Sequence, residues 1–280
     1  MTSKKVESSH WYTRDGKPAH TQPTKQTSKK KPKSLFRPTN IRDARLHGLL
    51  PSVSAYTKML AAPGLERYKM MKVAEACYAN PPHPGEEMAE YVQNMLDKSK
   101  EDGMGAADLG TQVHAAIEAL LKGNEYEDYE VEVAHGHSCF LGKLVEPAYA
   151  KIDELGLTIE NAEIVLVNNE EGYAGTTDVK HRSAKGKGIL DWKSKRTKEG
   201  EPVVPNETHP MQIAAYYVAA FNDSQFDDAL CMNVYISTTE PGRVDVVKYD
   251  REQLIEAYKD FLCLTRLWRS QNNYDPRSST

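Results

Sequence analysis

Residues 173–193 read YAGTTDVKHRSAKGKGILDWK, two short β-rich segments separated by a polar turn that contains glycine. The first segment carries Gly175-Thr176-Thr177-Asp178, and the second ends in Asp191-Trp192-Lys193. Neighbouring strands can bring both carboxylates together, and the period of two along a strand places Lys193 on the same face as Asp191. Paired carboxylates are the oxygen ligands that Mg²⁺ or Mn²⁺ requires. An ordinary solvated hairpin would carry similar charges, so this stretch alone leaves both interpretations open.

The flanking segments predict an α/β protein with a mixed central β-sheet and helices on its faces. Strands are expected over residues 163–167, 173–179, 188–193, 230–237 and 243–249, from runs rich in β-branched and aromatic residues. Helices are expected over 209–222 and 251–270, and before the first strand over 52–59, 65–79, 86–100, 106–121 and 138–155. Gly103 and Gly105 are expected to form a turn between two of these helices. The N-terminal helices are expected to form a helical cap on this core.

The charge of the chain is unevenly distributed. The formal net charge is −4, but residues 1–40 hold ten Lys and Arg against Glu7 and Asp15, a net of +8, which leaves −12 for the other 240 residues. Residues 1–38 lack apolar periodicity, and we expect a disordered basic tail that could bind phosphate backbones. Beyond it we expect a helical region over 39–105 and a core over 106–280.

Two predicted helices carry polar residues at a spacing of four, which places them on one helix face. His114 and Glu118 follow Gly110 in the first helix, and Gln212 and Tyr216 share a face in the second. A lone histidine on such a helix is more often a buried core residue than a ligand, and two aromatic side chains are most simply explained as core. Each helix alone is therefore compatible with a purely structural role.

The four elements taken together, in this order, resemble the RecB-like branch of the PD-(D/E)XK nuclease superfamily. The resemblance covers Gly110 to Phe221, with Asp191 in place of the Glu that the third motif often carries. It implies a restriction-endonuclease-like core. Residues 50–65 also resemble the leader of phage-encoded exonucleases, a less specific match.

The resemblance implies a role for each matching residue. The divalent metal would be bound by His114, Asp178, Asp191 and the carbonyl of Trp192, and Lys193 would be the catalytic lysine. Gln212 and Tyr216 would support the site or contact the DNA backbone. Glu118 would be a further acid that holds His114 or a metal-bound water. Glu163 opens the first predicted strand and is either an outer acid of the site or a surface charge.

The same resemblance leads to expectations about cofactors. We expect Mg²⁺ or Mn²⁺, and no iron–sulfur cluster, because Cys77, Cys139, Cys231 and Cys263 lack the grouping that cluster-bearing members use. Sparse cysteines fit a reducing, cytoplasmic setting. The longest uncharged apolar run has nine residues, over 213–221, far short of the roughly 20 that span a bilayer.

We therefore expect a metal-dependent deoxyribonuclease that acts in replication, recombination or repair. An exonuclease that leaves 5′-phosphate and 3′-hydroxyl ends on single-stranded or duplex DNA is favoured. The acidic body suits a narrow active-site channel better than a broad duplex-binding face, because phosphate binding is driven by clustered Lys and Arg. A structure-specific endonuclease or nickase and a non-catalytic DNA-binding module of the same fold are the alternatives.

Overall fold

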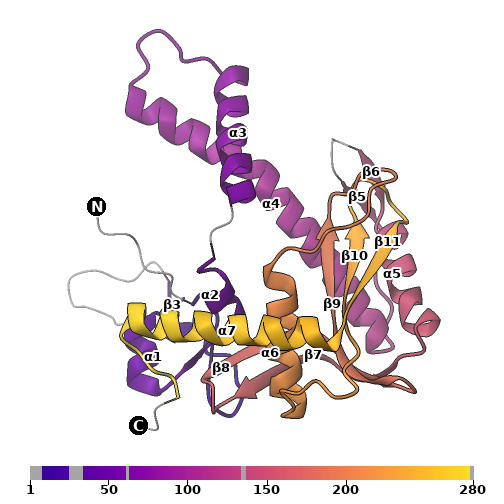
Figure 1. The fold of residues 1–280 in the computed structure, drawn as a ribbon. Helices are drawn as coiled ribbons and strands as arrows, with labels where there is room; N and C mark the ends of the chain where they lie inside the picture. The colour runs from indigo at the N-terminus through magenta and orange to yellow at the C-terminus, as the bar shows by residue number, and fades with distance from the viewer. Residues whose placement is uncertain (1–7, 25–33, 61–62, 134–136, 278–280) are drawn as a thin grey trace.

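The computed structural model describes residues 8–24, 34–60, 63–133 and 137–277. Its centre is a five-stranded mixed sheet in the order β11-β10-β9-β8-β7 (Figure 1). The strands are β7 (Thr158–Asn168), β8 (Tyr173–Ser183), β9 (Gly186–Lys195), β10 (Cys231–Ser237) and β11 (Val244–Tyr249). The predicted mixed sheet is confirmed, and it is built from the five predicted strand segments.

One connection makes the sheet mixed. β7, β8 and β9 form an antiparallel meander. The chain then passes through α6 (Thr208–Phe221) and re-enters the sheet as β10, parallel to β9, before β11 returns antiparallel. A parallel pair needs such a crossover, and the apolar helix supplies it.

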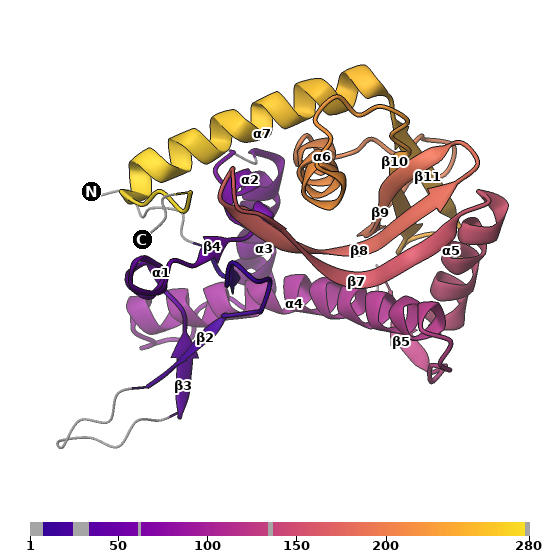
Figure 2. The same cartoon turned by 90° about the horizontal axis from the view of Figure 1, so that it is seen from below.

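Helices cover both faces of the sheet, with a separate apolar core on each (Figure 2). α6 and α7 (Arg251–Asn272) pack on one face, and α4 (Met88–Leu121) and α5 (Gly142–Glu154) pack on the other. Ile189 and Leu190 are adjacent in β9 and fully buried, yet they belong to opposite cores. This alternation is the geometry of a strand buried on both sides.

The expectation of a disordered basic tail is wrong for the part of it that the structure describes. β1 (Trp11–Tyr12) pairs with β4 (Leu50–Pro51), and β2 (Thr21–Pro23) pairs with β3 (Phe36–Pro38). Trp11 is fully buried, and its ring lies edge-on to that of Trp268 with 6.2 Å between centroids. The lysine cluster at residues 29–33 lies outside the described residues.

Replacing Trp11 with Ala is expected to lower the free energy of unfolding by about 3–5 kcal/mol, the range for truncating a buried aromatic side chain. The reason is that the indole fills space between β1 and α7 that no neighbour can occupy. Tyr78 is 93% exposed on α3 (Pro63–Ala79), so Tyr78→Ala is the matched control and should leave stability unchanged. Urea denaturation measures both. A wild-type midpoint for Trp11→Ala would exclude residues 8–24 from the core.

The N-terminal helices differ from the prediction at one junction. The segments 86–100 and 106–121 form a single helix, α4, which runs through Gly103 and Gly105, so the expected turn is wrong and the boundary between residues 105 and 106 falls inside a helix. A glycine costs about 1 kcal/mol in a helix relative to alanine, which a long helix can absorb. α3 packs along the first half of α4, and this helical hairpin extends away from the sheet (Figure 1).

The remaining N-terminal elements are short. α1 (Ile41–His47) and α2 (Val53–Thr57) precede the hairpin, and α2 packs against α6 and α7. The helix expected over 138–155 starts later, because β6 (Ser138–Phe140) pairs with β5 (Glu130–Glu132) before α5 begins. None of the helices in the described part of the chain combines the length and the apolar character that crossing a bilayer requires.

Candidate active site

The candidate site lies where β8 and β9 separate. The two strands pair from the turn as far as Val179 and Leu190, and their pairing ends there. Beyond that point β8 stays paired with β7, while β9 continues beside β10. At the fork, the carboxylate of Asp178 accepts a hydrogen bond from the backbone N–H of Trp192 at 2.7 Å. The Asp178 side chain thus takes the place of a strand partner for the Trp192 N–H, and this hydrogen bond fixes Asp178 beside the strand that carries Asp191.

Three residues from three elements meet at this fork. Ligand atoms of His114 in α4, Glu163 in β7 and Asp178 in β8 all lie within 4.8 Å of one another. His114 Nδ1 is 3.6 Å from Asp178 Oδ2. Such a set offers one imidazole nitrogen and carboxylate oxygens, donors that suit divalent ions from Mg²⁺ to the first-row transition metals.

Glu163 reaches this position through an unusual backbone. It lies between the paired residues Ala162–Val179 and Ile164–Thr177, and therefore stands across from Asp178. Its φ of +49° is in the left-handed region, which a strand residue other than glycine rarely adopts. Such outliers cost about 1–3 kcal/mol and concentrate at functional sites. Glu163 thus lies inside β7 and not at its start.

The close approach of these three residues shifts the pKa values of Glu163 and His114. Burial raises the pKa of Glu163 to about 7, and the negative charges of Asp178 and Glu118 add to this. Burial lowers the pKa of His114, but contact with Asp178 and the charges of Asp178 and Asp191 outweigh it, so the net shift is upward. A cation bound among these groups would relieve the repulsion between the carboxylates.

Asp191 and Lys193 form the second half of the site. Asp191 is 2% exposed, and its Oδ2 lies 2.5 Å from Lys193 Nζ. Burial raises the pKa of Asp191 to about 6, against the opposing effect of the Lys193 charge. Burial lowers the pKa of Lys193, but the charges of Asp191 and Asp178 raise it by more. The net shift is upward, so the ammonium remains protonated at neutral pH.

The two residues predicted on α6 lie together next to the fork. Gln212 Nε2 donates to the hydroxyl of Tyr216 at 3.3 Å, and the Tyr216 ring is buried against β8. A Cβ at Gly175 would lie 2.8 Å from Tyr216 Cε1, so glycine is required for α6 to approach β8 this closely. Burial raises the pKa of Tyr216, and the negative charges of Asp191 and Asp178 add to the rise.

The roles expected of Glu118 and Trp192 stay predictions, and the structure gives the contacts of both residues. The carboxylate of Glu118 forms an ion pair with Lys122 on the same helix. The Trp192 side chain is buried in the core beneath α4 and α5, and its backbone N–H is the group that contacts Asp178. Metal binding by the Trp192 carbonyl remains a prediction.

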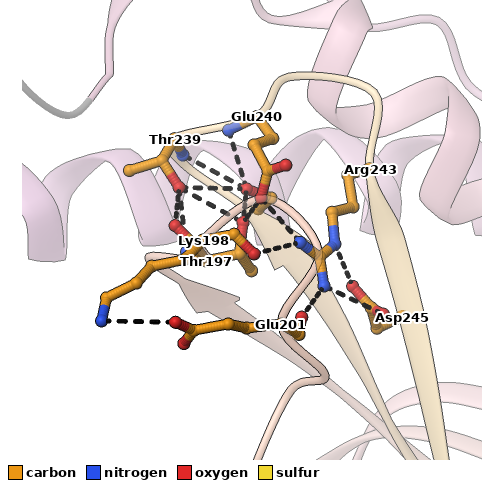
Figure 3. A network of polar contacts seen from close by, with 8 residues as sticks. Thr197, Lys198, Glu201, Thr239, Glu240, Arg243 and Asp245 are labelled. Atoms are coloured by element: carbon orange, nitrogen blue, oxygen red, sulfur yellow. Dashed lines mark hydrogen bonds and ion pairs between the residues drawn. The ribbon is translucent and has the colours of Figure 1, made fainter.

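A polar network fixes the loop that follows Lys193 (Figure 3). Arg243 donates to the carboxylates of Glu240 and Asp245 at 2.7 and 2.8 Å, and to the carbonyls of Lys198 and Glu201 at 2.9 and 2.6 Å. The hydroxyl of Thr197 lies 2.6 Å from that of Ser237, at the end of β10. The loop between β9 and α6 is therefore held against the β10–β11 turn.

Sequence reasoning missed Asn233. Its side chain is fully buried in β10 and donates to Asp191 Oδ2 at 2.9 Å. The available signal was a single amide in the otherwise apolar run Cys231-Met232-Asn233-Val234-Tyr235-Ile236. A buried polar side chain needs a partner, and the register of β10 decides which.

Comparison with protein-family models found no match, and comparison with curated proteins found none either. Among solved structures, one described as "Crystal structure of SSO0001" is 18% identical, with a TM-score of 0.28. The match covers 72% of this chain and 87% of that chain. Similarity at this level carries no argument about fold or function.

Proposed function

We propose that this protein is a divalent-metal-dependent DNA nuclease with a restriction-endonuclease-like core of the RecB-like PD-(D/E)XK type. The observation that carries the proposal is the fork between β8 and β9. Residues singled out by four separate motifs converge on it, with His114 and Asp178 in contact and Asp191 paired with Lys193. A hairpin with ordinary surface charges would instead place these side chains in solvent.

The residues of the fork suit hydrolysis of a phosphodiester. His114, Glu163, Asp178 and Asp191 would hold the metal, which supplies Lewis-acid activation of the phosphodiester and of the attacking water. Lys193 is only 23% exposed in its side chain and stays protonated, so its ammonium group can stabilise the negative charge that develops on the phosphoryl oxygens. Gln212 and Tyr216 would contact the DNA backbone.

Within this class we propose an exonuclease that acts on DNA ends. The body of the chain is acidic, which suits a narrow active-site channel better than a broad duplex-binding face. Purified protein should be incubated with end-labelled linear DNA and with covalently closed circular DNA, in Mn²⁺, in Mg²⁺ and in EDTA. The proposal expects metal-dependent loss of the linear substrate alone. Cleavage of the circle would identify an endonuclease, and binding without cleavage would identify a DNA-binding module.

The imidazole of His114 is expected to influence metal preference. Imidazole suits transition metals, whereas carboxylates suit Mg²⁺ and Mn²⁺ alike. Wild-type protein should therefore use Mn²⁺ readily, and His114→Asp should shift the ratio of Mn²⁺- to Mg²⁺-supported cleavage towards Mg²⁺ even if overall activity falls. Cleavage rates in each metal measure the ratio, and the melting temperature reports on folding. If His114→Ala lowers the melting temperature and leaves the ratio unchanged, His114 is a core residue and no ligand.

A further inference from the structure

Asp191 is held from the neighbouring strand by an amide that no sequence motif includes. Asn233 is directly across from Asp191 in the parallel pairing of β9 and β10. Its Nδ2 donates to Asp191 Oδ2 at 2.9 Å and to the Asp191 carbonyl at 3.2 Å. Asn233 is fully buried, so these hydrogen bonds form without competition from water.

The orientation of the Asn233 amide is set by a third residue. The hydroxyl of Tyr249, in β11, donates to Asn233 Oδ1 at 2.7 Å. An amide whose oxygen accepts this hydrogen bond must turn its nitrogen the other way, towards Asp191. Tyr249 is 7% exposed, so this contact is also shielded.

The contacts of the Asp191 carboxylate are concentrated on one of its two oxygens. Among the residues that the structure describes, the side-chain hydrogen bond and the ion pair of this carboxylate both involve Oδ2, from Asn233 and Lys193. Two donors on one oxygen hold Oδ2 in place, and with it the orientation of the carboxylate.

We propose that Asn233, oriented by Tyr249, is a positioning residue that holds the Asp191 carboxylate through Oδ2 in the orientation in which it would serve as a ligand of a divalent ion. This inference rests on the proposed function, because it assumes that Asp191 contributes a ligand. Mutating a residue that hydrogen bonds to a metal ligand typically lowers metal affinity or activity about 10–100-fold. A purely structural role for Asn233 would affect folding alone.

Calorimetric titration with Mn²⁺ separates the two roles without reference to catalysis. Asn233→Leu removes the donor at nearly constant volume and should weaken Mn²⁺ binding about 10–100-fold. Tyr249→Phe keeps the Asn233 amide but removes the hydrogen bond that orients it. This variant should weaken Mn²⁺ binding less than Asn233→Leu does. The matched control is Ser237→Ala at the other end of β10, which removes a buried hydrogen bond with Thr197 and should leave Mn²⁺ binding unchanged.

The outcomes are distinguishable. Wild-type Mn²⁺ affinity in Asn233→Leu, with a lowered melting temperature, would overturn the positioning role while leaving the metal site intact. If Asn233→Leu does not fold, unchanged Mn²⁺ affinity in Tyr249→Phe overturns it equally. DNA cleavage by the wild type, assayed in the same buffer, tests the proposed function separately. Wild-type protein that binds no Mn²⁺ would remove both proposals.

Discussion

Replacing Asp178 with Asn is expected to reduce metal-dependent DNA cleavage at least about 1000-fold, equivalent to about 4 kcal/mol in the activation barrier. Asp178 is the residue that links the elements at the fork. It contacts His114, stands across from Glu163 and accepts a hydrogen bond from the backbone N–H of Trp192. Asparagine keeps the shape and an acceptor for the Trp192 N–H, so the fork should remain folded. Only the charge that attracts the cation is lost.

The effect of Asp178→Asn is measured by the rate at which label is released from linear DNA at saturating Mn²⁺, with the melting temperature recorded alongside. Asp245→Asn is the matched control, because Asp245 is also a partly buried, paired carboxylate but belongs to the Arg243 network. The control should cleave at the wild-type rate. Cleavage by Asp178→Asn within tenfold of wild type would show that the reaction does not use this site.

Replacing Lys193 with Met is expected to slow cleavage about 100–1000-fold while metal binding and DNA binding persist. The magnitude is that of removing one preorganised group that stabilises charge developing in the transition state. Methionine retains the length and the packing of the side chain but cannot stabilise the phosphoryl oxygens. Asp191 would still be held through its hydrogen bond from Asn233.

Lys195 provides the control for Lys193→Met. It lies two residues further along β9, and its Nζ donates to the carbonyl of Val204 in the loop before α6. Lys195→Met removes the same charge from the same strand and should leave the cleavage rate within a few-fold of wild type. Equal losses in the two variants would mean that Lys193 acts only through the overall charge of this face.

The centre of the sheet could be predicted because β10 and the middle of β9 are buried on both faces and therefore appear as nearly continuous apolar runs. The same logic failed at the N-terminus. Trp11 and Tyr12 are two apolar residues within a polar, basic stretch, too few for a periodic signal. Yet Trp11 packs against α7 and Tyr12 against Leu50 and Ala174, which ties residues 8–24 to the body. Composition predicts whether a segment can form its own core, not whether it can join another.

The residues of the candidate site that belong to local sequence motifs could be predicted. The residues that reach the site only through the pairing of distant strands could not. Spacing along β9 put Asp191 beside Lys193, and the fork bears this out. Glu163 required knowledge of the register between β7 and β8 and of a positive φ within a strand. Asn233 comes next to Asp191 only because the crossover through α6 makes β10 parallel to β9 at that register.

The central claim is that a divalent ion binds at the fork between β8 and β9. Calorimetric titration of the folded wild-type protein and of Asp178→Asn with Mn²⁺, in the absence of DNA, tests it most directly. The account predicts that the wild type binds Mn²⁺ and that Asp178→Asn, with an unchanged melting temperature, binds it at least about tenfold more weakly. Equal Mn²⁺ affinity in the two proteins would contradict the account.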